Sequence, residues 1–151
     1  EEIGNDILIL KKLGAQFVRR IGEYKGFEGI FFVGQFLEAK SREELLAQVT
    51  KVFGQEPQTA FFGKERIRTI GVISGGGARK EIFSQLSPSD VDVYLTGEIE
   101  EHVPPAAKEM GLNFIAAGHY ATEVFGVQEI AEKLKERFRV ETTFIPVRVP
   151  Y

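Results

Sequence analysis

From residue 67 onward, short apolar segments alternate with amphipathic ones, and this alternation is what most constrains the fold. Short apolar runs are typical of buried strands, and apolar residues three and four positions apart are typical of helices. The predicted strands are Ile67–Ile73, Val91–Leu95, Leu112–Ala116 and Thr142–Val147. The predicted helices are Ala78–Leu86, Glu98–Met110 and Tyr120–Phe138. This order implies an α/β fold, with a largely parallel or mixed sheet and helices on both faces.

The residues before this region have their own pattern. Apolar residues at helical spacing over Ile7–Val18 predict a helix, with Gly14 as its expected stop. Ser41 followed three residues later by Glu44 is a capping box, which predicts the start of a second helix. Strands are predicted over Gly29–Phe36 and Thr59–Phe62. We therefore expect three parts, namely a helical remnant of a preceding lobe (1–21), a smaller α/β lobe near the amino terminus (22–64) and a main α/β lobe (65–151).

The last predicted helix carries a regular apolar stripe. Its members recur every three or four residues, and they are Tyr120, Val124, Val127, Ala131, Leu134 and Phe138. Such a stripe is typical of a helix face that packs against a core. We expect Val127, Ala131 and Leu134 to be buried, and Glu129, Glu132 and Lys133 to face water.

Composition excludes several classes of function. The chain has no cysteine, which excludes thiolate catalysis, iron–sulfur clusters and disulfides and leaves His, Asp and Glu to bind any metal. A formal net charge of −3 offers no basic surface for nucleic acid. No apolar run approaches the roughly 20 residues of a membrane span. The absence of disulfides and targeting signals favours the cytoplasm.

Polar or glycine-rich segments follow three of the predicted strands. They are Ser74–Gly77, Thr96–Glu98 and Gly118–Glu123. Ligands of α/β sheets bind at the carboxyl ends of strands. We therefore expect these three segments to face one cavity.

His119 and Glu123 are four residues apart at the start of a helix, so both side chains lie on one face and can share a cation. An imidazole and a carboxylate suit zinc, iron, manganese or nickel. The alternative is an ordinary surface pair. Because the amino-terminal end of a helix disfavours cations, a metal here needs further anionic ligands from elsewhere.

The other two strand-end segments allow two interpretations each. The amides of Ser74, Gly75, Gly76 and Gly77 could bind an anion at a helix start, or the run could be a tight turn packed against neighbouring backbone. Glu98 could be a general acid–base catalyst or a partner behind a metal ligand, or it could only complement a helix dipole. We expect His102 to face solvent.

Several segments, in this order along the chain, resemble the signature of the Nif-three-like family, whose members are often called GTP cyclohydrolase 1 type 2 homologues. The central ones are Tyr94–Glu98, Ala107–Asn113 and the Gly-His-Tyr-Ala-Thr-Glu motif at Gly118–Glu123. Gly4–Asp6 is similar to the family's Gly-Asn-Asn segment, and Ser74–Gly77 to its glycine run.

The resemblance implies a centre of two divalent metal ions per subunit with five protein ligands, two of which fall on His119 and Glu123. The other three are a consecutive His-His pair and an Asp that precede the Gly-Asn-Asn segment, and this sequence has neither. Asp6 lies within that segment and is not assigned as a ligand. Because the chain begins with Glu1 rather than Met, we expect that an upstream portion is missing and that the 151 residues bind little metal.

The expected function is that of a metal-dependent hydrolase. The resemblance implies a small-molecule, nucleotide-like substrate, a ring-like homohexamer, and no nucleic-acid or membrane partner. In this reading His119 and Glu123 bind metal and Glu98 carries a proton. One alternative is a metal-binding or protein-interaction module without turnover, and another is a folded fragment that cannot hold metal.

Overall fold

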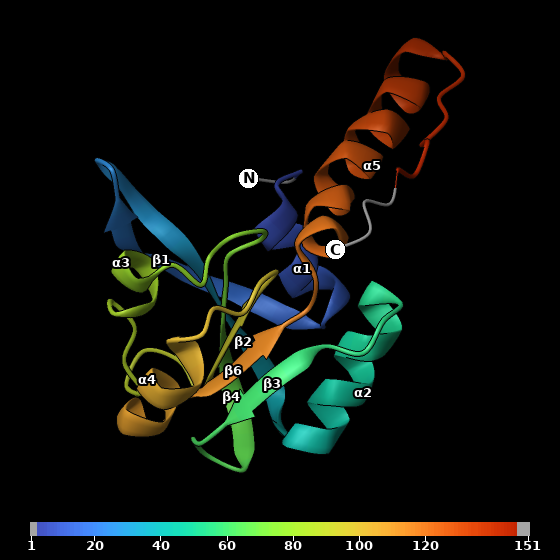
Figure 1. The fold of residues 1–151 in the computed structure, drawn as a ribbon. Helices are drawn as coiled ribbons and strands as arrows, with labels where there is room; N and C mark the ends of the chain where they lie inside the picture. Colours follow the sequence, from blue (N-terminus) through green and yellow to red (C-terminus); the bar gives the residue numbers. More distant parts are fainter. Residues whose placement is uncertain (1–2, 148–151) are drawn as a thin grey trace.

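A computed structural model describes residues 3–147 and contains one six-stranded mixed sheet with helices on both faces. The strands are β1 (Ala15–Tyr24), β2 (Phe27–Ser41), β3 (Gln58–Phe61), β4 (Arg66–Val72), β5 (Val93–Thr96) and β6 (Asn113–Ala116). The helices are α1 (Asn5–Lys12), α2 (Arg42–Phe53), α3 (Lys80–Phe83), α4 (Val103–Met110) and α5 (His119–Phe138). The predicted α/β class is confirmed (Figure 1).

The sheet has the strand order β1-β2-β4-β5-β6-β3. Its centre is parallel, with β5 between β4 and β6, and the remaining pairings are antiparallel. Strands from the range 22–64 are therefore hydrogen-bonded into the same sheet as strands from the range 65–151. The sheet continues across the predicted lobe boundary, and the division into three parts stays a prediction.

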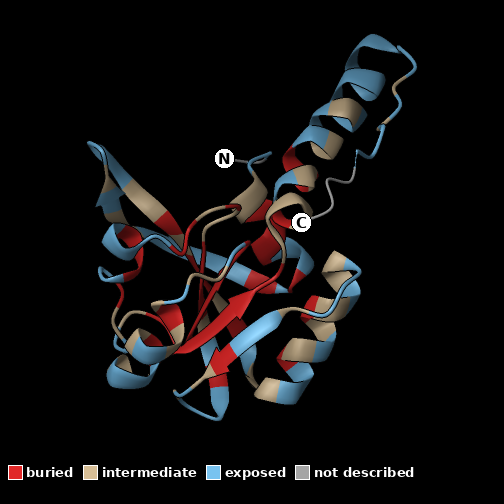
Figure 2. Cartoon of the chain, viewed as in Figure 1, coloured by how far each residue is buried: buried red, intermediate tan, exposed pale blue. Residues whose placement is uncertain are grey.

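Alternate residues of the central strands point to opposite faces of the sheet, and each face has its own core. On one face, Leu95 and Ile115 pack with α1, α2 and the first turns of α5. On the other face, Tyr94 and Phe114 pack with α3 and α4, and their rings are 5.7 Å apart. Figure 2 shows β6 almost wholly buried between these layers.

The capping box that begins α2 is confirmed. The Ser41 hydroxyl accepts a hydrogen bond from the Glu44 amide at 3.1 Å, and the Glu44 carboxylate accepts one from the Ser41 amide at 2.6 Å. The helix ends at Gly54, which is left-handed at φ 71°. These local bonds fix both ends of α2.

The first predicted helix stops at the glycine expected to end it, and the apolar residues beyond that glycine are not helical. The helix ends at Lys12, Gly14 adopts φ 67°, and residues from Ala15 onward form β1. Phe17 has a spacing that also suits a helix, but it pairs with Gly34 of β2. Pairing with the fifteen-residue strand β2 therefore outweighed the local helical pattern.

Two other helices are shorter than predicted. Only Lys80–Phe83 of the range Ala78–Leu86 forms α3. Helix α4 begins at Val103 rather than at Glu98, because Pro104 and Pro105 suit the first turn of a helix, where their missing N–H groups cost nothing. Glu98 therefore lies in a loop, so the interpretation in which it only complements a helix dipole is wrong.

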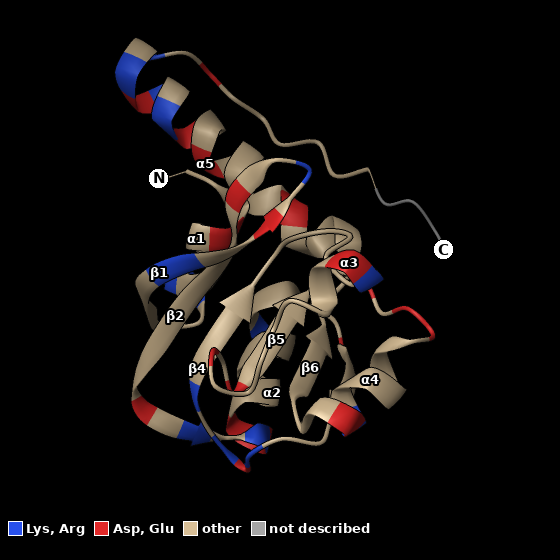
Figure 3. Ribbon diagram, turned by 90° about the vertical axis from the view of Figure 1, so that its left-hand side faces the viewer, with Lys and Arg blue, Asp and Glu red and all other residues tan. Residues whose placement is uncertain are grey.

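The apolar stripe of α5 was misinterpreted over its outer half. Thr122, Phe125 and Gly126 are buried, whereas Val127 is 58% exposed and Leu134 is 42% exposed. Figures 1 and 2 show why, since the helix extends beyond the sheet and its outer half has no layer to pack against. Charged residues of both signs surround this half (Figure 3).

Other parts of the α5 prediction fared differently. Glu132 and Lys133 are exposed as expected, while Ala131 and Glu129 are half-buried.

The strand predicted over Thr142–Val147 is absent, and this segment has no regular secondary structure. It runs back toward the start of α5, where Phe144 lies beside Val124.

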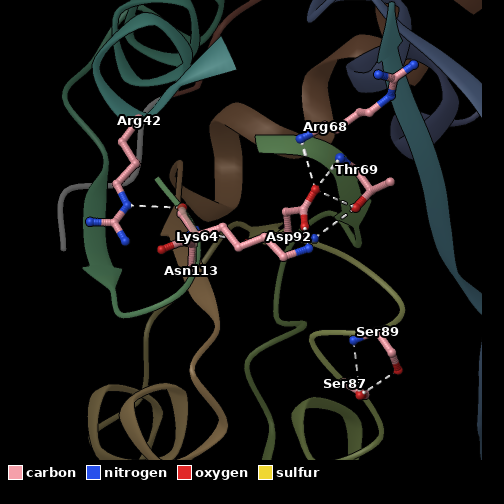
Figure 4. A network of polar contacts seen from close by, with 8 residues as sticks. All are labelled: Arg42, Lys64, Arg68, Thr69, Ser87, Ser89, Asp92 and Asn113. Carbon is pink, nitrogen blue, oxygen red and sulfur yellow. Dashed lines mark hydrogen bonds and ion pairs between the residues drawn. The ribbon is translucent and has the colours of Figure 1, made fainter. Parts of the chain in front are cut away.

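A network around Asp92 fixes the starts of the parallel strands (Figure 4). The Oδ2 atom of Asp92 accepts from the amides of Arg68 and Thr69, both at 2.9 Å, and from the Thr69 hydroxyl at 3.0 Å. Its Oδ1 atom lies 2.7 Å from the Lys64 ammonium. Asn113 donates to the carbonyls of Asp92 and Lys64. Burial opposes ionisation of Asp92, but these bonds outweigh it and lower its pKa.

None of the helices in residues 3–147 is long and apolar enough to cross a membrane.

Candidate functional site

Short backbone hydrogen bonds join the segments that follow β4, β5 and β6. The amide of Gly97 donates to the carbonyl of Gly75 at 2.9 Å, and the amide of Gly118 donates to the carbonyl of Gly97 at 2.9 Å. The three segments therefore meet at one edge of the sheet, as their positions after neighbouring strands predict, and that they face one cavity stays a prediction.

Gly97 must be glycine for this approach. A Cβ at this position would lie 2.7 Å from the carbonyl oxygen of Gly75 and 2.7 Å from the Cα of His119. Backbone atoms cannot yield as a flexible side chain can. The loop after β5 can therefore lie between the other two segments only because it has no side chain there.

His119 lies between two carboxylates. Its Nδ1 atom is 2.5 Å from Oε1 of Glu98, and its Nε2 atom is 3.2 Å from Oε2 of Glu123. The imidazole is 36% exposed, so this group is accessible from solvent. The hydrogen bond that the ring donates to Glu98 raises the pKa of His119, burial lowers it, and the Glu123 charge raises it further, for a net increase.

The two contacts of the ring differ in kind. An ionised carboxylate only accepts hydrogen bonds, so Glu98 holds the ring proton on Nδ1. In the neutral ring, Nε2 then presents a lone pair to Glu123, and two electron-rich atoms face each other. A proton or a cation between Nε2 and Glu123 resolves this mismatch.

The pair also has a separation that suits a metal. Two donor atoms each about 2.1 Å from a tetrahedral cation are about 3.4 Å apart. The observed separation of 3.2 Å between Nε2 of His119 and Oε2 of Glu123 is close to this value. Within residues 3–147, however, no group of three or more His, Asp or Glu side chains could hold a metal ion. His119 and Glu123 fit as two ligands of a site that needs others.

The glycine turn after β4 is held by the protein itself. The amide of Ser74 donates to Asp6 at 2.7 Å, that of Gly75 to the Thr122 hydroxyl at 2.9 Å, and that of Gly77 to the Thr96 hydroxyl at 3.0 Å. These three N–H groups are therefore not available to an anion. The geometry favours the tight-turn interpretation over the anion-binding one, with Gly76 packed near Glu98.

Sequence reasoning missed the part that Asp6 plays at this site. The carboxylate of Asp6 accepts from the Ser74 amide across 68 positions of sequence and so ties α1 to the glycine turn. Burial raises the pKa of Asp6, the bonds from Ser74 oppose this, and the nearby charge of Glu123 adds to the increase. Asn5 likewise accepts from the amide of Gly126 at 2.7 Å. The signal was the Gly4–Asp6 segment, which the resemblance had already marked.

His102 lies apart from this group. Its ring packs edge-on against Phe83 at 6.5 Å, and its Nδ1 atom lies 3.5 Å from Glu100. The prediction that His102 faces solvent is wrong, because the side chain is half-buried and its Nε2 atom is covered by protein. The cause is the packing of the loop before α4 against α3.

Comparison with known proteins gives a consistent family match. A family model described as Duf34/NIF3 (NGG1p interacting factor 3) matches residues 1–150. Curated relatives named GTP cyclohydrolase 1 type 2 homolog are 36% identical over 146 residues in Pyrococcus horikoshii and 34% identical over 144 residues in Pseudomonas aeruginosa. Each match covers 95% of this chain but 56% of the relative. The chain therefore spans about half the length of these relatives.

Solved structures with the same fold were also found. One is described as protein ybgI of unknown function, with a TM-score of 0.87 and 28% identity, covering 99% of this chain and 58% of that one. Another is reduced HcgD from Methanocaldococcus jannaschii, with a TM-score of 0.75 and 26% identity, covering 89% of this chain and 52% of that one. Both likenesses extend over most of the described sheet and its helices.

Proposed function

The chain belongs to the Duf34/NIF3 family, and from this premise we propose that it contributes His119 and Glu123 to the metal centre of a hydrolase. The proposed substrate is a nucleotide-like small molecule, because the curated relatives carry the name GTP cyclohydrolase 1 type 2 homolog. A homo-oligomeric assembly, which the family resemblance implies, is part of the same proposal.

The observation that carries the proposal is the position of His119 between two carboxylates. Histidines that bind metals usually donate their other ring N–H to a carboxylate, which fixes the ring and makes it a better ligand. Glu98 is in this position, 2.5 Å from Nδ1. The opposite ring nitrogen faces Glu123 at a separation that a shared cation fits.

Of the two functional roles considered for Glu98, this arrangement favours the partner behind a metal ligand over the acid–base catalyst. As a partner of Nδ1 it orients His119 and stabilises positive charge on the ring. In this position it is a positioning residue, and transfer of a proton to substrate is not required of it. Zinc, iron, manganese or nickel would supply the electrophilic catalysis and the activation of water that such hydrolases use.

Asp6 and Thr122 support the ligands indirectly. Thr122 is on the same helix turn as His119 and Glu123, and its hydroxyl accepts from the amide of Gly75. Asp6 holds the amide of Ser74. These bonds keep the glycine turn against the start of α5, where a Cβ on Gly75 would lie 2.3 Å from the Glu123 carboxylate. The turn thus limits the positions that Glu123 can take.

Turnover is the property to test. The protein encoded by the complete gene would be freed of metal, reloaded with each candidate ion, and assayed for release of product from GTP. We expect activity that depends on the ion, its loss in His119→Ala and Glu123→Gln, and a reduction of about 10- to 100-fold in Glu98→Gln if its effect on metal affinity limits activity.

The matched control is His102→Ala, because the chain has two histidines and His102 lies outside the site. It should retain full activity. A metal-loaded protein with no activity on GTP or other nucleotides would refute the hydrolase assignment. The alternative of a metal-binding module without turnover would then stand. Equal activity in His119→Ala and His102→Ala would refute the assignment of the site.

A further inference from the structure

A cavity of about 510 Å³ lies between the end of α2 and the start of α5, with His119 in its wall. Its volume falls within the range of about 300–1,000 Å³ that is typical of small-molecule sites. Glu123 does not line it, so it is beside the His119–Glu123 face rather than identical with it.

Aromatic side chains from three parts of the chain line this cavity. Phe53 comes from the last turn of α2, Tyr120 and Phe125 from the start of α5, and Phe144 from the segment after α5. The rings of Phe53 and Phe125 are 5.6 Å apart and tilted by 53°, an arrangement that aromatic rings favour. Such walls favour a flat, polarisable ring over an aliphatic chain.

The polar side chains of the wall are His119, the neutral amides of Gln55 and Gln128, and the hydroxyl of Tyr120. The side-chain amide of Gln55 donates to the carbonyl of Ala117 at 2.9 Å, which fixes its position, and Gln128 also lines the cavity. The Tyr120 hydroxyl is covered by protein and has no hydrogen-bond partner within residues 3–147. This hydroxyl is therefore not a contact for a ligand in the cavity.

The wall contains no Lys, Arg, Asp or Glu. The one wall residue that can carry a positive charge is His119, and it already lies between the carboxylates of Glu98 and Glu123. A phosphate group would therefore find no free counter-charge here, whereas a neutral ring with hydrogen-bonding edges would find both stacking and amide partners. We propose that this cavity binds a neutral planar heteroaromatic ring, such as a purine base. The idea that the ring belongs to the substrate rests on the proposed function, but the binding of the ring does not.

The probe is 2-aminopurine riboside, a neutral fluorescent purine nucleoside. The chain has no tryptophan, so the background fluorescence of the protein is low. Titrations would use the complete protein with metal removed by a chelator, and ribose 5-phosphate would serve as the competitor that lacks a ring. We expect saturable binding of the nucleoside and no competition by ribose 5-phosphate.

Phe144→Ala should weaken nucleoside binding by at least about 5-fold, the lower end of what loss of a stacked aromatic costs. Phe144 belongs to neither core cluster, so the fold should persist. Ile145→Ala is the matched control, since Ile145 is 75% exposed and does not line this cavity. Tyr120→Phe should leave nucleoside binding unchanged, because the hydroxyl it removes is covered by protein.

Glu123→Gln separates this proposal from the metal assignment. It should remove metal binding and leave nucleoside binding unchanged, because Glu123 does not line the cavity. Loss of nucleoside binding in Glu123→Gln would place the ring on the metal face and overturn the proposal. Equal affinities in Phe144→Ala and Ile145→Ala, effective competition by ribose 5-phosphate, or no saturable binding would also overturn it.

Discussion

Replacing Asp92 by alanine should be among the most damaging single changes to a polar residue of this chain. Asp92 is 8% exposed, and its carboxylate accepts four hydrogen bonds. Two of the donors are backbone amides of β4, and these would be left without this partner. Removal of one member of a buried charged network costs about 3–5 kcal/mol.

The contribution of each bond supports this figure. Hydrogen bonds to a charged group contribute about 1.5–3 kcal/mol each, but three of the donors share the single atom Oδ2, so their sum is an overestimate. The Lys64 side chain is 68% exposed, and its ion pair with Asp92 therefore adds about 1 kcal/mol or less. We expect Asp92→Ala to lower the free energy of unfolding by about 3–5 kcal/mol, and Asp92→Asn to fall between this variant and the unaltered chain.

The assay is urea unfolding followed by circular dichroism. Asp90→Ala is the matched control, because Asp90 also forms an ion pair, at 3.3 Å to Arg19, but its carboxylate is 30% exposed whereas that of Asp92 is 8% exposed. It should cost less than about 1 kcal/mol. If Asp92→Ala costs no more than Asp90→Ala, the network does not stabilise the sheet as described here.

Three further predictions concern pH, packing and the glycine turn. The pKa of Asp92 is lower in the folded protein than in the unfolded chain. The stability that its carboxylate adds should therefore be complete above about pH 4 and be lost as the pH falls through the folded-state pKa. The difference in unfolding free energy between wild type and Asp92→Ala should accordingly shrink in unfolding titrations near pH 3. Phe125→Ala should cost about 3–5 kcal/mol of stability, and Leu134→Ala less than about 1.5 kcal/mol, because Phe125 is 8% exposed and Leu134 is 42% exposed; equal costs in thermal unfolding would contradict the packing of α5. Gly75→Ala should lower stability by about 1–2 kcal/mol through its φ of +67° and displace the Glu123 carboxylate, which a crystal structure of the variant would reveal.

The parts of the fold that sequence predicted well are those fixed by short-range chemistry. The capping box at Ser41 and the glycine at position 54 determine the ends of α2 through bonds within a few residues. The meeting of His119 with Glu98 follows from their positions after neighbouring parallel strands. In both cases the relevant partners are specified locally or by the order of strands.

The parts that failed depend on what surrounds an element. The stripe through Val127 and Leu134 is correctly helical, yet burial requires an opposing layer that the sheet does not supply at that distance. The segment around Phe17 became a strand because β2 pairs with it. The link between Asp6 and Ser74 joins residues 68 positions apart, and no local pattern specifies such a contact.

The most direct test of the account is the affinity for Zn²⁺, measured by competition with a chromogenic chelator in the complete protein. Wild type and His102→Ala should bind with the same affinity and stoichiometry, whereas His119→Ala should lose at least one ion while retaining its circular dichroism spectrum. Glu98→Gln should bind about 10- to 100-fold more weakly than wild type, because the imidazole loses the carboxylate behind it. An undiminished zinc complement in His119→Ala would contradict the assignment of His119 as a metal ligand, and with it the central claim.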